Sequence, residues 1–220
     1  MKEYPKIDGI FMREEQRPHN LIWGVYRNEL HNDLEKLEWV FSEKVDGTNI
    51  RIHWDGHKVT FGGRTDAAQI PAHLFTELNE LFGGTTNEQV FEQKFGEAEV
   101  TLYGEGYGAK IQKGGGLYSA TPKFILFDVR IGHTWLKRES VEDIAKAFGI
   151  EAVPIVFRGT LDDAIAFAKI GFNSLIAEQE RESEGMVGTP TCGVLDRMGK
   201  RVIVKLKTND LKPKENGDAS

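Results

Sequence analysis

The sequence predicts an α+β fold in which two mainly antiparallel sheets are flanked by helices. Short stretches of alternating apolar and polar residues, such as residues 49–54, are typical of strands. Tight turns such as Asp55-Gly56 follow these stretches directly, which favours hairpins. Apolar residues at helical spacing, as in residues 71–95, separate the groups of strands. These patterns indicate antiparallel sheets rather than a doubly wound parallel fold.

The same patterns locate the individual elements. Strands are expected at residues 38–41, 49–54, 58–61, 100–103, 123–130, 135–136, 152–157, 185–188 and 201–207. Helices are expected at residues 71–82, 86–95, 140–148, 160–170 and 174–179. Ser140 with Asp143, and Thr160 with Asp163, have the spacing of N-terminal helix caps. The alternation in the second strand places Ile50, Ile52 and Trp54 on the side of the core.

No repeat or clear domain boundary interrupts this pattern. We therefore expect residues 1–208 to form one domain. Residues 209–220 are mostly polar and are expected to be a disordered tail.

Composition and charge exclude several classes of protein. The chain has 220 residues with 40% hydrophobic and 28% charged residues, which is ordinary for a globular protein. No apolar run is long enough to cross a membrane, and Cys192 is the only cysteine, so we expect a cytoplasmic setting without disulfides. The net charge of −6 argues against bulk attraction to nucleic acid. Residues 197–214 are rich in lysine and arginine and form either a local nucleic-acid contact or a solvated surface.

Lys44 is an unusual residue for its position in the sequence. It follows an apolar stretch and precedes the tight turn Asp46-Gly47. An amine that is partly buried at such a junction loses hydration, which lowers its pKa and makes it a usable nucleophile. The alternative is a surface lysine beside a turn, and the four residues Lys44–Gly47 by themselves favour this alternative because short motifs recur by chance.

Polar residues farther along the chain change this balance. Four short motifs follow Lys44-Val45-Asp46-Gly47 along the chain. In order, they are Leu102-Tyr103-Gly104-Glu105, Phe127-Asp128-Val129, Ser183-Glu184-Gly185-Met186-Val187 and Val204-Lys205-Leu206-Lys207. The five motifs resemble the signature of the covalent nucleotidyltransferase superfamily, which contains ATP-dependent RNA and DNA ligases and capping enzymes. The pattern is most similar to RNA ligases of the phage nick-sealing and RNA-editing type.

The resemblance implies an adenylyltransferase domain of the ATP-grasp-like DNA and RNA ligase kind, with an ATP cleft between the two sheets. It implies that Lys44 attacks the α-phosphate of ATP and forms a lysyl–AMP intermediate, assisted by Lys205 and Lys207. Glu43 would lie near the adenine edge, and Phe127 would stack on the base. The implied nucleotide-binding set comprises Glu43, Lys44, Val45, Asn49, Arg51, Arg64, Glu105, Phe127, Glu184, Lys205 and Lys207.

The resemblance also implies a divalent cation, Mg²⁺ or Mn²⁺, with Glu184 and Asp46 as its protein ligands. Carboxylate oxygens suit such hard cations, which retain several waters. The lysines at positions 205 and 207 would lower the pKa of the attacking amine and hold the phosphate oxygens on which charge accumulates.

Each assignment has a simpler alternative. Phe127 is equally compatible with a core position, and Asp128 with a strand end or a partner for Arg130. Arg51 and Lys113 rank below Arg64 as candidate site residues, since both are compatible with surface charges. The assignment of Glu184, which lies among other acidic residues, rests on the glycine that follows it. Cys192 is expected to be an incidental thiol.

The resulting functional hypothesis is an ATP-dependent RNA ligase that joins a 3′-hydroxyl to a 5′-phosphate. Its partners would be nicked duplexes or RNA ends, it would act as a monomer, and it would work in the cytoplasm, or in the host cytoplasm if it is phage-encoded. Only about a dozen residues follow Lys207, too few for the additional domain of such ligases. The expectation is therefore a catalytic domain on its own or a minimal ligase, with strongly salt-sensitive binding. The alternatives are a minimal DNA ligase and a non-catalytic nucleic-acid-binding protein that retains the fold.

Overall fold

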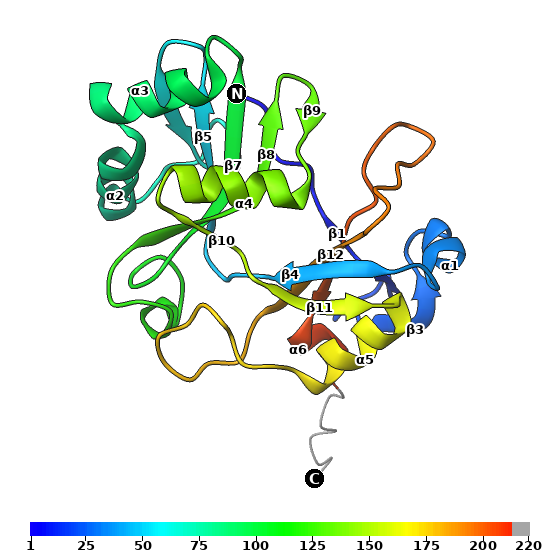
Figure 1. Cartoon of the computed structure of the whole chain (residues 1–220). Helices are drawn as coiled ribbons and strands as arrows, with labels where there is room; N and C mark the ends of the chain where they lie inside the picture. Colours follow the sequence, from blue (N-terminus) through cyan, green and yellow to red (C-terminus); the bar gives the residue numbers. More distant parts are fainter. Residues whose placement is uncertain (213–220) are drawn as a thin grey trace. The chain divides into compact units, whose positions relative to one another are not determined.

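The computed structural model describes residues 1–212 and has the α+β fold that the sequence predicts. The chain divides into two compact units. Unit 1 comprises Met1–Pro5, Val45–Val153 and Ile176–Arg181, and unit 2 comprises Lys6–Lys44, Pro154–Leu175 and the chain from Glu182 onward. Each unit contains one large sheet (Figure 1). No helix within the described residues is long and apolar enough to cross a membrane.

Unit 1 is built on a six-stranded sheet with the order β10-β8-β7-β5-β6, in which β9 also pairs with β8. All of its strand pairs are antiparallel except that between β10 and β8. The strands are β5 (Thr48–Trp54), β6 (Val59–Gly62), β7 (Val100–Tyr107), β8 (Lys123–Ile131), β9 (Thr134–Trp135) and β10 (Glu151–Ala152). Its helices are α2 (Ala72–Phe82), α3 (Gly84–Phe95), α4 (Arg138–Ala147) and the short 3₁₀ helix η1 (Gly115–Leu117).

Helices α2, α3 and α4 pack against one face of this sheet (Figure 1). Ile50, Ile52 and Trp54 of β5 are buried in the resulting core, as their alternation predicts. Their partners include Leu78 of α2 and Phe91 of α3. The residues that alternate with them, such as Arg51, belong to the opposite face of the sheet. The apolar helix faces therefore cover one side of the sheet and leave the polar side for other contacts.

Unit 2 is built on a five-stranded sheet with the order β1-β13-β12-β4-β11, accompanied by the two-stranded sheet β2-β3. The strands are β1 (Asp8–Gly9), β2 (Phe11–Arg13), β3 (Leu21–Tyr26), β4 (Trp39–Glu43), β11 (Ile155–Gly159), β12 (Gly185–Pro190) and β13 (Val204–Lys207). The helices are α1 (Leu30–Leu34), α5 (Leu161–Ile170) and α6 (Thr208–Leu211). Trp39, Phe41, Met186 and Leu206 are among the buried residues of its core.

Several predicted elements were wrong in type or extent. Residues 174–179 do not form a helix, and the strand expected at 152–157 is divided into β10 and β11 around Val153 and Pro154. Proline has no N–H for a continuous ladder, which accounts for the interruption. The N-cap of α4 is Lys137, without a side-chain cap, whereas Thr160 caps α5 as predicted by accepting a hydrogen bond from the Asp163 N–H.

The C-terminal part of the chain also differs from the expectation. The last strand begins at Val204 rather than at residue 201, and β7 continues through Glu105 instead of ending at Tyr103. The tail predicted from residue 209 contains the end of helix α6, whose Leu211 is buried in the core of unit 2. The prediction for residues 213–220 lies outside the described residues.

Replacing Leu211 by alanine tests the contribution of α6 to the core. Leu211 is only 1% exposed, so we expect Leu211→Ala to lower the free energy of unfolding by about 2–4 kcal/mol in urea titrations. Leu175 is 66% exposed, so Leu175→Ala should stay within about 0.5 kcal/mol of the wild type. Equal stability of the two variants would contradict the structural role of α6.

Candidate active site

Lys44 lies at the end of β4, an inner strand of the unit 2 sheet. β4 runs between β12 and β11. The backbone N–H of Lys44 donates a hydrogen bond to the carbonyl of Gly185 at 2.9 Å, and the side chain is 24% exposed. The lysine is therefore partly buried where a strand ends, as its sequence context predicts.

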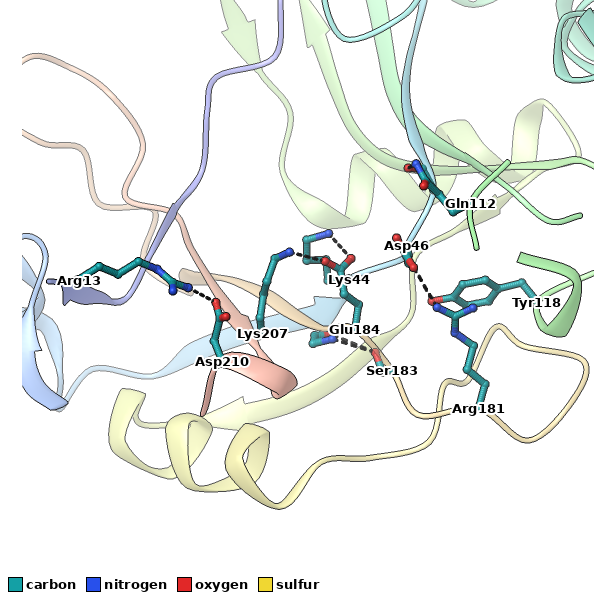
Figure 2. Close-up of polar contacts among 12 residues, drawn as sticks. Arg13, Lys44, Asp46, Gln112, Tyr118, Arg181, Ser183, Glu184, Lys207 and Asp210 are labelled. Atoms are coloured by element: carbon teal, nitrogen blue, oxygen red, sulfur yellow. Dashed lines mark hydrogen bonds and ion pairs between the residues drawn. The ribbon is translucent and has the colours of Figure 1, made fainter. Parts of the chain in front are cut away.

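One carboxylate contacts Lys44 and a second lysine. Lys44 Nζ donates to Glu184 Oε2, and Lys207 Nζ lies 2.7 Å from Glu184 Oε1. Figure 2 shows both lysine side chains directed at this carboxylate. Three residues that the sequence analysis singled out separately thus form one ion-paired cluster within unit 2.

The strand register explains why these three side chains meet. In the antiparallel pair of β12 and β13, Gly185 lies opposite Lys207, and in the pair of β12 and β4, Met186 lies opposite Glu43. Glu184, which precedes β12, is therefore at the level at which β4 ends. A Cβ atom at Gly185, where φ is +146°, would lie 2.0 Å from the carbonyl oxygen of Leu206. Only glycine fits this approach, which accounts for the Glu-Gly sequence.

The two lysines keep Glu184 ionised. Burial alone raises the pKa of the Glu184 carboxyl, but Lys44 and Lys207 outweigh burial and hold the pKa below its ordinary value of 4.5. Because this carboxyl is a weak base, it is better suited to orient the amine of Lys44 than to remove its proton.

Lys205 shares a face of β13 with Lys207. Val204 and Leu206 are both 1% exposed and belong to the core of unit 2, whereas the two lysines that alternate with them are partly exposed. The alternation predicted for this strand is confirmed for these four residues. Both lysines therefore project away from the core.

Glu43 and Val45 lie on either side of Lys44 in the sequence. Glu43 is 2% exposed, and its Oε2 accepts a hydrogen bond from the Leu175 N–H at 2.8 Å in unit 2. Val45 packs in a small apolar cluster of unit 1 that includes Tyr118. These contacts do not test the roles toward a nucleotide, which stay predictions.

Asp46 forms an ion pair in unit 1 with an arginine that the sequence analysis missed. Arg181 Nη2 lies 3.0 Å from Asp46 Oδ2, and its guanidinium lies 4.1 Å from the ring centre of Tyr118 (Figure 2). The Asp46 N–H also donates to the Tyr118 hydroxyl at 3.2 Å. Arg181 is the single basic residue in the acidic run at 178–184, which is the signal that sequence reasoning overlooked.

The polar face of the unit 1 sheet carries two further predicted residues. Asn49 of β5 and Glu105 of β7 lie opposite each other in the ladder. Within the described residues, Asn49 Oδ1 is buried and has no hydrogen-bond partner. A buried acceptor without a partner is costly, which favours Asn49 as a residue that contacts a ligand.

Arg51 is fully buried and holds a loop of unit 1. Its guanidinium donates to the carbonyls of Gly63 and Met1 at 2.6 and 3.1 Å and to Asp66 at 2.9 Å. These contacts fix the segment that carries the exposed Arg64. The structure thus gives Arg51 a positioning role, and its direct contact with a nucleotide stays a prediction.

Phe127 of β8 is held by aromatic contacts on the polar face of the unit 1 sheet. Its ring centre lies 5.0 Å from that of Tyr4, which also packs 5.1 Å from Tyr103 and 5.4 Å from Trp135. The Tyr4 hydroxyl donates to Asp128 at 2.8 Å. Sequence reasoning gave Tyr4 no role, because nothing in the extended N-terminal segment indicated which strands it would cover.

The described residues offer few protein ligands for a divalent cation. Within residues 1–212, no group of three or more His, Cys, Asp and Glu side chains is arranged to hold a metal ion. The ionised carboxylate of Glu184 fits a hard cation that takes its remaining oxygens from phosphate and water. Asp46, the other predicted ligand, is ion-paired with Arg181 in this structure.

Comparison with known proteins identifies the family of the chain. The sequence model of the RNA ligase family matches residues 37–207, a segment that contains Lys44, Glu184 and Lys207. The chain belongs to the RNA ligase family. The first 36 residues lie outside the matched segment. The sequence has no significant match among curated proteins.

Solved structures of an RNA ligase from Naegleria gruberi resemble this family member. The ligase with pyrophosphate has a TM-score of 0.60 and 21% identity, and the match covers 82% of this chain and 52% of that protein. For a glutamate-to-alanine variant with ATP and Mn, the TM-score is 0.61 at 18% identity, and the match covers 94% of this chain and 62% of that protein. For a lysine-to-methionine variant with AMP and Mn, the TM-score is 0.59 at 19% identity, and the match covers 82% of this chain and 52% of that protein.

These identities show a common fold and nothing more specific. The chain spans between 52% and 62% of the length of these three ligase structures. The fold predicted from the sequence, an α+β adenylyltransferase-type domain, is confirmed.

The lowered pKa of Glu184 predicts a pH dependence of stability. A carboxyl whose pKa is lower in the folded than in the unfolded chain stabilises the fold above its ordinary pKa, and the effect disappears as the pH falls through the folded value. Below about pH 4.5, the wild type should therefore lose more stability than Glu184→Gln, as measured by urea titration at pH 7 and pH 3. Glu180→Gln, a change at an exposed carboxylate, is the control. Equal losses in wild type and Glu184→Gln would refute the ion-paired arrangement.

Proposed function

We propose that this chain carries the nucleotidyltransferase activity of an ATP-dependent RNA ligase. The observation that supports this most directly is the Lys44–Glu184–Lys207 cluster inside the segment that matches the RNA ligase family. In the first step, Lys44 Nζ attacks the α-phosphorus of ATP. A phosphorus–nitrogen bond forms, the bond to the bridging oxygen breaks, and pyrophosphate leaves.

Two further steps would complete the reaction. The AMP passes from Lys44 to a 5′-phosphate of the nucleic acid, and the phosphorus–nitrogen bond is broken. The 3′-hydroxyl then attacks this activated 5′-phosphate and loses its proton to solvent. The bond between the 5′-phosphorus and the bridging oxygen breaks, and AMP leaves as the phosphodiester bond forms. In each step the charge on phosphate oxygens grows, which lysines at positions 205 and 207 are suited to stabilise.

The ion pair of Lys44 has a defined place in this proposal. Only a neutral amine has a lone pair for attack, so the contact between Lys44 and Glu184 must open and the ammonium must lose a proton to solvent. A bound Mg²⁺ or Mn²⁺ would supply positive charge that polarises the phosphate. Glu184 is the residue that would hold such an ion, and in doing so it would release Lys44.

Further residues are assigned to the nucleotide by the resemblance to the family. Arg64 and Glu105 would contact the ribose or phosphate, the ring of Phe127 would stack on the base, and the buried Asn49 Oδ1 would make a polar contact. Glu43 would recognise the adenine edge. Arg51 would act through the loop that it holds.

The family match favours RNA as the substrate, joined at nicks or at free ends. We further propose that the protein acts as a monomer in a reducing cytoplasm, where the exposed thiol of Cys192 remains free. A DNA ligase would use the same chemistry, and a non-catalytic binding protein would need none of the three clustered residues.

Incubation with α-labelled ATP and Mg²⁺ tests the first step. We expect a labelled protein band that pyrophosphate reverses, that Lys44→Ala lacks and that Lys207→Ala forms about 10²-fold more slowly. Lys36→Ala, a change at an exposed lysine, should label like the wild type. The ligase proposal fails if the wild type is never labelled with either Mg²⁺ or Mn²⁺, and labelling with GTP alone would indicate capping chemistry instead.

Matched nicked duplexes distinguish the substrates. With RNA, DNA and hybrid strands of identical sequence, we expect sealing to be fastest when the strand ends at the nick are RNA. The measurement is the rate of product formation on denaturing gels at constant salt, because binding to phosphates is salt-dependent. Preferential sealing of all-DNA nicks would identify a DNA ligase.

A further inference from the structure

Unit 2 contains a cavity of about 290 Å³ at the edge where β1 pairs with β13. Its walls come from β1, β2 and β13, from the segment between β3 and α1, and from α6. The positively charged residues that line it are Lys6, Arg13, Arg27, Lys205 and Lys207. Two acidic residues, Asp8 and Asp210, also line it, so its formal charge is +3 in a chain whose net charge is −6.

The two acidic residues hold the two arginines. Arg13 donates to Asp210, and Arg27 Nε lies 3.6 Å from Asp8 Oδ1. A guanidinium has five N–H donors, so one carboxylate orients it without using all of them. Both arginine side chains are about two-fifths exposed, which leaves them accessible from solvent. Each arginine thus pairs with one carboxylate, and Arg13 also donates to the His19 carbonyl at 3.1 Å. Both arginines keep further N–H groups that an anion can reach.

The cavity shares Lys207 with the candidate active site. Lys207 lines the cavity and also pairs with Glu184, which contacts Lys44. Figure 2 shows the Arg13–Asp210 pair on one side of Lys207 and the Lys44–Glu184 pair on the other. An anion in the cavity would therefore share Lys207 with the candidate active site.

We propose that this cavity is a phosphate-binding site formed by Arg13, Arg27 and Lys6 together with lysines 205 and 207. Arginine and lysine side chains that line one cavity suit phosphate groups, because phosphate oxygens accept hydrogen bonds from guanidinium and ammonium donors. Lys6, Arg13 and Arg27 precede residue 37, so the site extends beyond the segment that matches the family.

Two phosphate sources have this chemistry: the polyphosphate of a nucleotide and the phosphodiester backbone of an RNA strand. Binding of phosphate as such does not depend on the proposed ligase activity. The choice between the nucleotide and the RNA strand as the phosphate source does rest on the proposed ligase activity, because the cavity adjoins Lys44 through Lys207.

Binding of inorganic pyrophosphate, measured by calorimetry on the full chain, tests the site directly. We expect Arg13→Gln/Arg27→Gln to bind about tenfold more weakly than the wild type or worse, since hydrogen bonds to a charged ligand are lost. Lys36→Gln removes one positive charge from an exposed position outside the cavity and should bind like the wild type. Lys6→Gln, which should weaken binding several-fold, replaces the double variant if urea titration shows that the latter is unfolded.

Two kinetic measurements identify the source. The cavity variant is Arg13→Gln/Arg27→Gln, or Lys6→Gln where that one replaces it. If its KM for ATP in the labelling reaction is higher than that of the wild type, the cavity binds the polyphosphate. A higher KM for an RNA strand that already carries AMP on its 5′-phosphate, sealed without ATP, indicates the RNA backbone. Wild-type pyrophosphate affinity and wild-type KM values in the folded cavity variant would overturn the inference. A wild type that is never labelled but binds pyrophosphate through these arginines would refute the ligase proposal and leave the site standing.

Discussion

The carboxylate of Glu184, shared between Lys44 and Lys207, is the interaction on which the candidate active site of unit 2 depends. It joins the ends of three adjacent strands, β4, β12 and β13, and keeps two positive charges close together that would otherwise repel each other. The lysines in turn keep this carboxyl ionised despite its burial. The cluster therefore holds together Lys44, the proposed nucleophile, and Lys207, a proposed phosphate-binding residue.

Close backbone approaches make this cluster possible. Gly185 lets β12 begin against the Leu206 carbonyl, so that the preceding glutamate reaches both lysines. Gly47 has a comparable role in unit 1, where a Cβ atom would lie 2.2 Å from the carbonyl oxygen of Gly106 on β7. Each glycine follows an acidic residue of a recognisable motif. In each motif, an acidic side chain is thus coupled to a backbone contact that only glycine allows.

The success of sequence reasoning varied with the range of the interactions involved. Alternation and turn signals located the hairpin of β5 and β6, the buried face of β5 and the two lysines of β13, because these depend on local geometry. The helix expected at 174–179 and the cap expected at Ser140 were wrong. Weak local propensity gave way there to tertiary contacts such as the hydrogen bond from the Leu175 N–H to Glu43.

The sequence by itself determined the fold class, the order of the motifs and therefore the family, since each depends on residue types within short segments. Only the tertiary structure decided which charges meet: Lys44 with Glu184, Asp46 with Arg181, and the buried Arg51 with the loop that carries Arg64. It also decided that Tyr4 packs against Phe127 and that Arg13 and Arg27 line a cavity with Lys207. The partners in most of these contacts are far apart in the chain. Strand order and register bring them together, and no local pattern encodes that register.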